Sequence, residues 1–360
     1  MTFISPTPES GTVPRRNMAF NIRINDQGGG VGRVEWRING MTIGVGGADD
    51  RGLKIVAWKQ QGVEIEKLIT LSPGQNTVEV VAYNSRNEIA SDPVSITLEL
   101  KDAISEKPSL YILAVGINDY RDGSLALKYS VPDVHAMTNA FKKGGKDIYQ
   151  KIRVTELLDD NVVIGGIEIA FKNLEAEVKT NDVFIFYLAG HGVTIDGRYY
   201  FLPYDFRFNN MESVKKSGIT QEHIQKWLSG ITSLKSLVLL DTCNSAAFKQ
   251  TATAQRGIAE KVAIDKLTRA MGRLTFAASA EDLPALEGCE GHGCFTFSLL
   301  QSLREADGKN GNNNGLVETN ELIGYVSDLL PDITRKKFGH EQNPQISDQQ
   351  GMPFPLVRAQ

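Results

Sequence analysis

A histidine and a cysteine occupy matching places in this sequence, each directly after a strongly apolar run. His191 lies in the segment AGHG (189–192), and Cys243 lies 52 residues later in DTCNS (241–245). A neighbouring imidazole lowers the pKa of a thiol and returns its proton to a leaving amine. The pair predicts a catalytic dyad with Cys243 as nucleophile and His191 as general acid and base, and the backbone N–H groups of Gly192 and Cys243 would bind the oxyanion. The alternative for Cys243 is a buried structural cysteine.

The segments that carry this pair belong to an alternation of strand-like and helix-like runs. Near-continuous apolar runs, typical of strands covered on both faces, occupy residues 110–118, 182–190, 236–242 and 273–279. Between them, apolar residues recur at i, i+3, i+4 and i+7 from Val134, Ile167 and Ile224, as in amphipathic helices. This α/β pattern predicts a mostly parallel sheet flanked by helices. Ligand sites of such sheets lie beyond the carboxyl ends of the strands, which is where His191 and Cys243 stand.

The first hundred residues follow a different pattern, that of short alternating strands. Val34, Trp36 and Ile38 share one face of a half-buried strand, and Asn39-Gly40 then supplies two residues that tolerate the positive φ of a tight hairpin. Strands at this spacing predict an all-β immunoglobulin-like or fibronectin-type sandwich. The expected organisation is a disordered N-terminus at 1–15, the sandwich at 16–100, a charged linker at 101–108 and the α/β domain at 109–360.

Composition and charge argue against several classes of function. The chain has 39 basic and 43 acidic side chains, and a net charge of −4 is too small and of the wrong sign for a surface that tracks nucleic-acid phosphates. The sequence has no apolar run of about 18 residues and no secretory signal, so no membrane partner is expected. Three irregularly spaced cysteines argue against a disulfide framework and predict reduced thiols in the cytoplasm.

The pair GHG and DTCNS, each ending an apolar strand, resembles the motifs of the caspase-hemoglobinase fold. The closest pattern is that of the metacaspase and orthocaspase branch, which reads S-G-H-G and D-x-C-x-S, whereas the Q-A-C-x-G signature of the animal enzymes is absent. The resemblance covers about residues 108–345 and includes AVGINDY, the AAS strand and GHGCFTFSLL. The sandwich resembles immunoglobulin-like modules fused to bacterial caspase-like domains. The resemblance implies a cysteine endopeptidase that acts through a thioester acyl-enzyme.

The same resemblance implies an acidic specificity pocket. Asp241 matches one acidic pocket residue of metacaspases and Asp133 matches the second, which implies cleavage after Arg or Lys in protein or peptide substrates. Two positions depart from the family pattern: Ala189 replaces a small hydroxyl residue, and Ser130 stands where metacaspases often carry a second cysteine. The alternative for Asp133 is a carboxylate that stabilises a helix N-terminus beside Pro132, and the two roles are compatible.

A basic segment follows the predicted nucleophile, in the region where caspases undergo activating cleavage. Arg256 in TATAQRG is the expected site of self-processing if the pocket selects basic residues. The alternative is a solvated helix face. The basic residues of this segment are Lys249, Arg256, Lys261, Lys266, Arg269 and Arg273.

Two further motifs imitate metal sites. Residues 310–321 copy the frame of an EF-hand loop and end on Glu321, but the first ligand positions are asparagines, so we expect a polar turn before a helix that starts near Thr319. Cys289, His292 and Cys294 lie close together without the spacing of a zinc module, and we expect Cys289 in a loop and Cys294 in the core. No metal or other cofactor is required by the predicted reaction, although the resemblance leaves activation by calcium open.

The leading prediction is a caspase-like cysteine endopeptidase, with a regulator docking on the N-terminal sandwich. One alternative is a catalytically silent caspase-like scaffold that binds partners. Another is a different Cys/His acyl-transfer enzyme, such as a separase-like peptidase, in which the pocket acids would be dispensable.

Overall fold

The computed structural model describes residues 1–7, 11–46, 54–59, 62–71, 74–101, 107–244, 273–278, 286–309, 311–347 and 353–359. The chain divides into two compact units. The first is Met1–Glu106 with the short segments Lys179–Asn181 and Ser229–Leu234, and the second is the remainder from Lys107 onwards. The predicted linker at 101–108 lies mainly outside the described residues.

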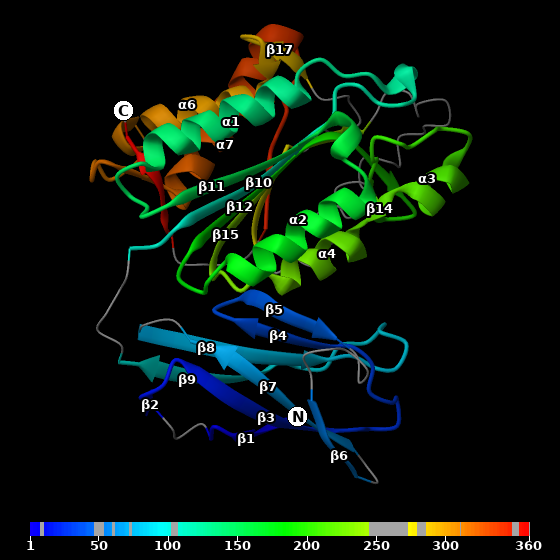
Figure 1. Ribbon diagram of the computed structural model, residues 1–360, viewed down its shortest axis with the longest axis vertical. Helices are drawn as coiled ribbons and strands as arrows, with labels where there is room; N and C mark the ends of the chain where they lie inside the picture. The colour runs from blue at the N-terminus through cyan, green and yellow to red at the C-terminus, as the bar shows by residue number, and fades with distance from the viewer. Residues whose placement is uncertain are drawn as a thin grey trace. The chain divides into compact units, whose positions relative to one another are not determined.

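The first unit consists of two β-sheets that share one apolar core (Figure 1). In the described residues, one sheet has the order β1-β3-β7-β6 and the other β2-β9-β8-β4-β5, and all pairs are antiparallel except β2 with β9. The core joins side chains of both sheets, among them Phe20, Trp36, Val63 and Leu98. The unit is thus a β-rich sandwich, consistent with the immunoglobulin-like prediction. The strands are β1 (Thr2–Ser5), β2 (Thr12–Val13), β3 (Asn17–Asn25), β4 (Val34–Ile38), β5 (Met41–Gly46), β6 (Lys54–Lys59), β7 (Gly62–Thr70), β8 (Gly74–Ala82) and β9 (Val94–Leu100).

The hairpin of β4 and β5 follows the predicted pattern. Asn39 and Gly40 connect the two strands with φ of 50° and 81°, the left-handed values that the turn requires. Glu35 on the opposite face of β4 is also buried, and its carboxylate accepts a hydrogen bond from Arg37 Nε. The three alternating apolar residues of β4 are buried: Val34, Trp36 and Ile38.

The prediction of a disordered N-terminus is wrong for the residues that form β1 and β2. Strand β1 pairs with β3, and the Phe3 ring lies 6.3 Å from the Phe20 ring in an edge-to-face contact. Strand β2 pairs with β9 and buries Val13. Both strands are too short to show a clear period-two pattern, so only tertiary packing reveals them.

The second unit contains a mixed sheet of eight described strands. Its main path is β11-β10-β12-β15-β16-β20, with β13 and β14 attached beside β12. The pairs from β11 to β16 are parallel, whereas β20, β13 and β14 pair antiparallel with their neighbours. The strands are β10 (Leu110–Gly116), β11 (Ile152–Leu158), β12 (Val183–Ile195), β13 (Arg198–Phe201), β14 (Ile219–Thr220), β15 (Lys235–Asn244), β16 (Leu274–Ala277) and β20 (Gln345–Ile346).

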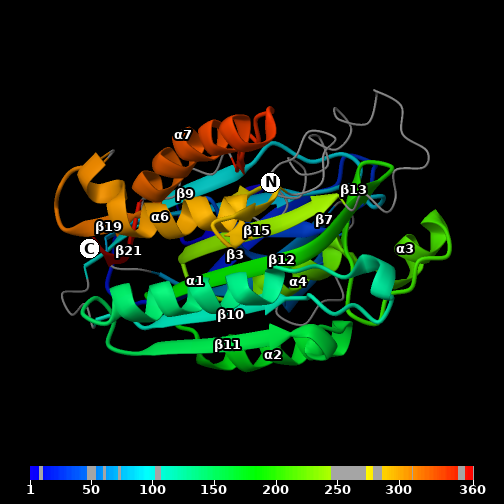
Figure 2. The same ribbon diagram turned by 90° about the horizontal axis from the view of Figure 1, so that it is seen from above.

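Helices cover both faces of this sheet. Helices α1, α6 and α7 lie over one face and α2 and α4 over the other (Figure 1), and Figure 2 shows the first three side by side above the strands. Two small antiparallel pairs, β17 with β18 and β19 with β21, lie outside the main sheet. The bounds are α1 (Ser130–Gly145), α2 (Ile164–Glu177), α3 (Met211–Ser217), α4 (Gln221–Gly230), α6 (Cys294–Lys309), α7 (Thr319–Phe338), β17 (Glu287–Cys289), β18 (His292–Gly293), β19 (Leu316–Glu318) and β21 (Pro355–Arg358).

The central position of β12 in the sheet explains why its sequence is continuously apolar. Ile185 and Tyr187 belong to the core under α1, α6 and α7. Phe184 and Phe186 point to the other face, where their ring centroids lie 6.3 and 5.3 Å from that of Phe171 on α2. A strand with both faces covered has no need of polar alternation, so the predicted doubly covered sheet is confirmed.

The three predicted amphipathic helices are present as α1, α2 and α4. The predicted apolar stripe of α2 is buried along its whole length. None of the helices in the described part of the chain is long and apolar enough to cross a membrane.

Candidate active site

The sheet places the predicted nucleophile and base directly across from one another. Strands β12 and β15 run parallel in a register that pairs His191 with Cys243 and Gly192 with Asn244. Strand β10 ends opposite Ala189, so His191 and Cys243 lie at the carboxyl edge of the sheet. Neighbouring strands lie about 4.8 Å apart, which places the backbones of the two residues next to one another. The side chain of Cys243 lies outside the described structure, and its contacts stay a prediction.

The imidazole of His191 is buried and oriented by groups that the sequence did not indicate. Its Nε2 lies 2.8 Å from the carbonyl oxygen of Leu125, and its ring packs on Tyr120 with the centroids 5.1 Å apart. The backbone N–H of His191 donates to the Tyr120 hydroxyl at 2.8 Å. A carbonyl oxygen only accepts hydrogen bonds, so Nε2 carries the proton and Nδ1 holds the free lone pair of the neutral ring.

Burial also favours the neutral form of this ring. Removal from water lowers the pKa of His191, and the hydrogen bond to Leu125 offsets only part of that effect. A neutral imidazole with an unprotonated Nδ1 is the form that can take a proton from a thiol.

The glycines on both sides of His191 are required by close packing. Gly190 has φ of +152°, and a Cβ there would lie 2.8 Å from the Tyr120 hydroxyl oxygen. A Cβ at Gly192 would lie 2.8 Å from the ring of Tyr199. Because both distances are far below contact distance, the GHG motif follows from the packing around the histidine. The oxyanion role of the Gly192 and Cys243 N–H groups stays a prediction.

Asp133 lies in the first turn of α1 and is bound by a hairpin from the far end of the sequence. Its side chain is only 3% exposed. One carboxylate oxygen, Oδ1, lies 2.6 Å from His292 Nδ1, and the other, Oδ2, accepts the backbone N–H of Gly293 at 3.0 Å. The position also suits the alternative role of a helix N-terminal carboxylate, and the two descriptions hold together.

Asp241 precedes the predicted nucleophile by two residues and is held by two hydroxyl groups. Its Oδ2 accepts from Thr296 Oγ1 at 2.6 Å and from the Tyr187 hydroxyl at 3.3 Å. Tyr187 and Thr296 also share a 2.6 Å hydrogen bond with one another. Burial raises the pKa of Asp241, and the hydrogen bonds from Thr296 and Tyr187 partly offset this rise.

The two carboxylates converge on one point at Gly293. A Cβ at this glycine would lie 3.1 Å from Oδ2 of Asp133 and 3.4 Å from Oδ2 of Asp241. Asp133 comes from a helix and Asp241 from a strand, so only the fold brings them together. Gly293 and His292 were not identified as site residues from the sequence, where their motif was considered only as a metal site.

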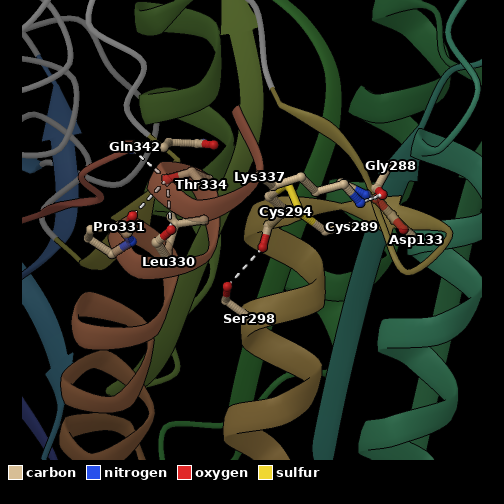
Figure 3. Close-up of a disulfide and its surroundings, with 11 residues drawn as sticks. Asp133, Gly288, Cys289, Cys294, Ser298, Leu330, Pro331, Thr334, Lys337 and Gln342 are labelled. Atoms are coloured by element: carbon tan, nitrogen blue, oxygen red, sulfur yellow. Dashed lines mark hydrogen bonds between the residues drawn. A yellow bond between two sulfur atoms is a disulfide. The ribbon is translucent and has the colours of Figure 1, made fainter. Parts of the chain in front are cut away.

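Cys289 and Cys294 form a disulfide that closes this hairpin, so the prediction of reduced thiols at these two positions is wrong. Cys289 ends β17 and Cys294 begins α6, with a Cα–Cα distance of 4.9 Å (Figure 3). The turn between them has left-handed backbone at Glu290 and Gly291, which brings the two cysteines together. An odd cysteine count says nothing about such a local pair. The burial predicted for Cys294 is confirmed, and the bonded sulfurs are not available as metal ligands.

Carboxylates of the protein itself accept the backbone N–H groups of the EF-hand-like loop. Glu321 accepts the backbone N–H groups of Asn312 and Glu318, both at 2.9 Å. Asp307 accepts those of Asn314 and Gly315 at 3.0 and 2.9 Å. Helix α7 begins at Thr319, as predicted. The prediction of a polar turn therefore holds for residues 311–321 of this loop; Asn310 lies outside the described residues.

The predicted self-processing site at Arg256 and most of the surrounding basic segment lie outside the described residues. Arg273 is the exception, and it is fully buried rather than solvated. Its guanidinium donates to Ser236 Oγ and to the carbonyl oxygen of Leu228, and burial lowers its pKa to about 9.

Comparison with known proteins identifies the family of this chain. A search of curated proteins finds no match. A protein from Geobacter sulfurreducens is similar over 70% of this chain and 98% of its own, at 15% identity and a TM-score of 0.43. Caspase-1 from Spodoptera frugiperda is similar over 71% of this chain and 92% of its own, at 11% identity and a TM-score of 0.43. Fibronectin(III)-like modules of Clostridium thermocellum CbhA are similar over 29% of this chain and 98% of their own, at 19% identity and a TM-score of 0.22.

The family model of the caspase domain matches residues 110–353. That range includes the described strands from β10 to β20 and both predicted dyad residues. Because the match spans well over half of the chain, this protein belongs to the caspase domain family of cysteine peptidases.

Proposed function

We propose that this protein is a cysteine endopeptidase in which Cys243 is the nucleophile and His191 the general acid and base. The observation that carries the proposal is the register of β12 and β15, which pairs the two residues at the carboxyl edge of the sheet. The wider metacaspase or orthocaspase assignment is part of the same proposal and rests on the GHG and DTCNS motifs.

The proposed reaction starts with transfer of the Cys243 thiol proton to Nδ1 of His191. The thiolate attacks the scissile carbonyl carbon, and the backbone N–H groups of Gly192 and Cys243 stabilise the oxyanion. The imidazolium then gives its proton to the leaving amine as the peptide C–N bond breaks, which leaves a thioester. Water, deprotonated by His191, hydrolyses the thioester and restores the thiol. No cofactor enters these steps.

The buried partners of His191 support this role. Leu125 fixes the tautomer by accepting from Nε2, and Tyr120 fixes the ring and the backbone behind it. Because the lowered pKa keeps the ring neutral near pH 7, the base is available without prior deprotonation.

We further propose that Asp133 and Asp241 form the floor of a pocket that selects Arg or Lys. Two carboxylates that converge at a glycine would attract a cationic side chain by charge-assisted hydrogen bonds. A bound guanidinium would lower the pKa of Asp241, which burial alone raises. Self-processing at Arg256 follows from the same selectivity.

The cytoplasmic location, calcium activation and docking of a regulator on the N-terminal sandwich are kept as proposals. The cysteines no longer support a cytoplasmic location, because two of them form a disulfide and disulfides are rare in a reducing cytosol. Alkylating the protein at the moment of cell lysis tests it: three labelled cysteines indicate a reducing compartment, and one indicates that the Cys289–Cys294 bond exists there.

The experiment that tests the peptidase proposal compares fluorogenic peptides that end in Arg, Lys or Asp, with and without calcium. Wild type should cleave after Arg and Lys, and Cys243→Ala should cleave nothing. No turnover of any peptide would favour the silent scaffold. Cleavage after Arg that survives Asp241→Ala would favour a separase-like peptidase without this pocket.

A further inference from the structure

One hairpin and the helix turn that follows it contact both proposed pocket acids. Its strand β18 supplies His292 and Gly293 to Asp133, and the first turn of α6 directly after it supplies Thr296 to Asp241. The dyad is held elsewhere, since the described contacts of His191 come from Tyr120 and Leu125. The groups that orient the pocket and those that orient the base therefore belong to separate parts of the chain.

His292 is the side chain of the hairpin that acts on Asp133. Gly293 donates a backbone N–H to one carboxylate oxygen, Oδ2. An ionised carboxylate only accepts hydrogen bonds, so beside ionised Asp133 the His292 Nδ1 carries the proton that it donates to Oδ1 at 2.6 Å. With a donor on each oxygen, the plane of this carboxylate is fixed.

The Cys289–Cys294 disulfide is the covalent constraint on this arrangement. The hairpin strands span only Glu287–Cys289 and His292–Gly293, and two-stranded hairpins of this size are marginal in water. The bond joins the residue before the turn to the residue after His292-Gly293, and it packs at the start of α6 with Asp133 beside the hairpin (Figure 3). Lys337 of α7 adds one more contact, to the carbonyl oxygen of Gly288.

We propose that His292 is a positioning residue for Asp133, that the Cys289–Cys294 disulfide keeps it in place, and that the two together set the affinity of the pocket for a basic side chain. This inference rests on the proposed selectivity for Arg and Lys. It assigns to the hairpin a role in specificity, whereas Cys243 and His191 carry the chemistry.

The kinetic test measures kcat and KM for an arginyl peptide. His292→Ala should raise KM about tenfold, the ratio that 1.4 kcal/mol represents, with kcat little changed. His292→Asn should restore KM, because the asparagine Nδ2 lies close to the place of Nδ1, while His292→Gln should not. The matched control is Glu290→Asn, an exposed turn residue of the same hairpin with φ of 51°, which should change neither constant.

The disulfide is tested with Cys289→Ser/Cys294→Ser, assayed beside wild type without reductant. Wild type should carry one alkylatable thiol, that of Cys243, before reduction and three after it. The double variant should raise KM in the same direction. Adding His292→Ala to it should raise KM by less than the product of the separate effects, because the two changes remove one arrangement.

A binding measurement separates this inference from the peptidase proposal. Agmatine, a guanidinium compound that cannot be cleaved, is titrated into Cys243→Ala and into its combinations with His292→Ala and His292→Asn. If His292→Ala weakens agmatine binding and His292→Asn does not, the inference is supported even if wild type cleaves no peptide. Unchanged KM and unchanged agmatine affinity overturn it even if cleavage after Arg is confirmed. A lower KM for His292→Ala also overturns it, since the hairpin would then obstruct the pocket.

Discussion

Replacing Asp241 by asparagine should stabilise the free protein and weaken its binding of arginyl substrates at the same time. The asparagine Oδ1 can still accept from Thr296 and Tyr187 in place of Asp241 Oδ2. What the variant loses is the negative charge that burial makes costly, as the raised pKa of Asp241 shows.

The direction of the pH dependence follows from that raised pKa. Below the ordinary pKa of an aspartate, about 3.9, the carboxyl group is protonated in both the folded and the unfolded state. As the pH rises, the unfolded state releases its proton first, so wild type loses stability until the pH passes the raised pKa of the folded state. The advantage of Asp241→Asn should therefore grow from about pH 4 upwards and then level off.

The magnitudes are measurable. Each unit of raised pKa corresponds to about 1.4 kcal/mol, and 1 kcal/mol shifts the Tm of a domain of this size by roughly 2–4 °C. A hydrogen bond to a charged group contributes about 1.5–3 kcal/mol, so KM for an arginyl peptide should rise about ten- to a hundredfold. Thermal melts between pH 4 and 8 and peptide kinetics give both values. A lower Tm for the variant at pH 7, or an unchanged KM, would refute the reasoning.

Three other substitutions probe the site and its surroundings. Tyr120→Phe removes the acceptor of the His191 backbone N–H. Because an unsatisfied buried donor costs about 1–3 kcal/mol, thermal melts should show a lower Tm, and peptide kinetics should show a lower kcat with KM unchanged. Gly293→Ala places a methyl group between the two acids and should abolish agmatine binding in calorimetry without removing the alkylation of Cys243 by iodoacetamide. Glu321→Ala leaves two backbone N–H groups of the EF-hand-like loop without their acceptor. The Tm should fall by several degrees, with kcat and KM unchanged. An unchanged Tm would contradict the role of this carboxylate in holding the loop.

The parts of the fold that could be predicted from the sequence are those encoded by short-range patterns. Continuous apolar runs predicted the doubly covered strands, and Asn39-Gly40 predicted the hairpin turn that the structure contains. The placement of His191 opposite Cys243 also follows from local information, because both residues end apolar strands and parallel strands align their ends. These features need no knowledge of which distant segments meet.

The groups that act on the site residues could not be predicted in this way. Tyr120 comes from the segment after β10 and Leu125 from the short 3-10 helix Gly123–Leu125, and neither segment has a periodicity that indicates what a side chain contacts. His292 was considered only as a metal ligand, and its partner Asp133 lies far away in the sequence. Arg273 counted as one of several basic residues, although it is buried against Ser236. In each case the deciding contact is tertiary.

The cysteines show why residue counts and residue positions answer different questions. A count of three excludes a framework in which every cysteine is paired. It does not exclude one disulfide, and the prediction that all three thiols are reduced went beyond the count. The structure pairs two cysteines whose Cα atoms a tight turn brings to 4.9 Å, and it leaves Cys243 on a separate strand. Such a division suits a thiol enzyme, because the only cysteine outside the bond is the proposed nucleophile. Because Cys289 and Cys294 are already paired, Cys243 is the one thiol left for an oxidant, and its reactivity then depends on the environment that the strand end gives it.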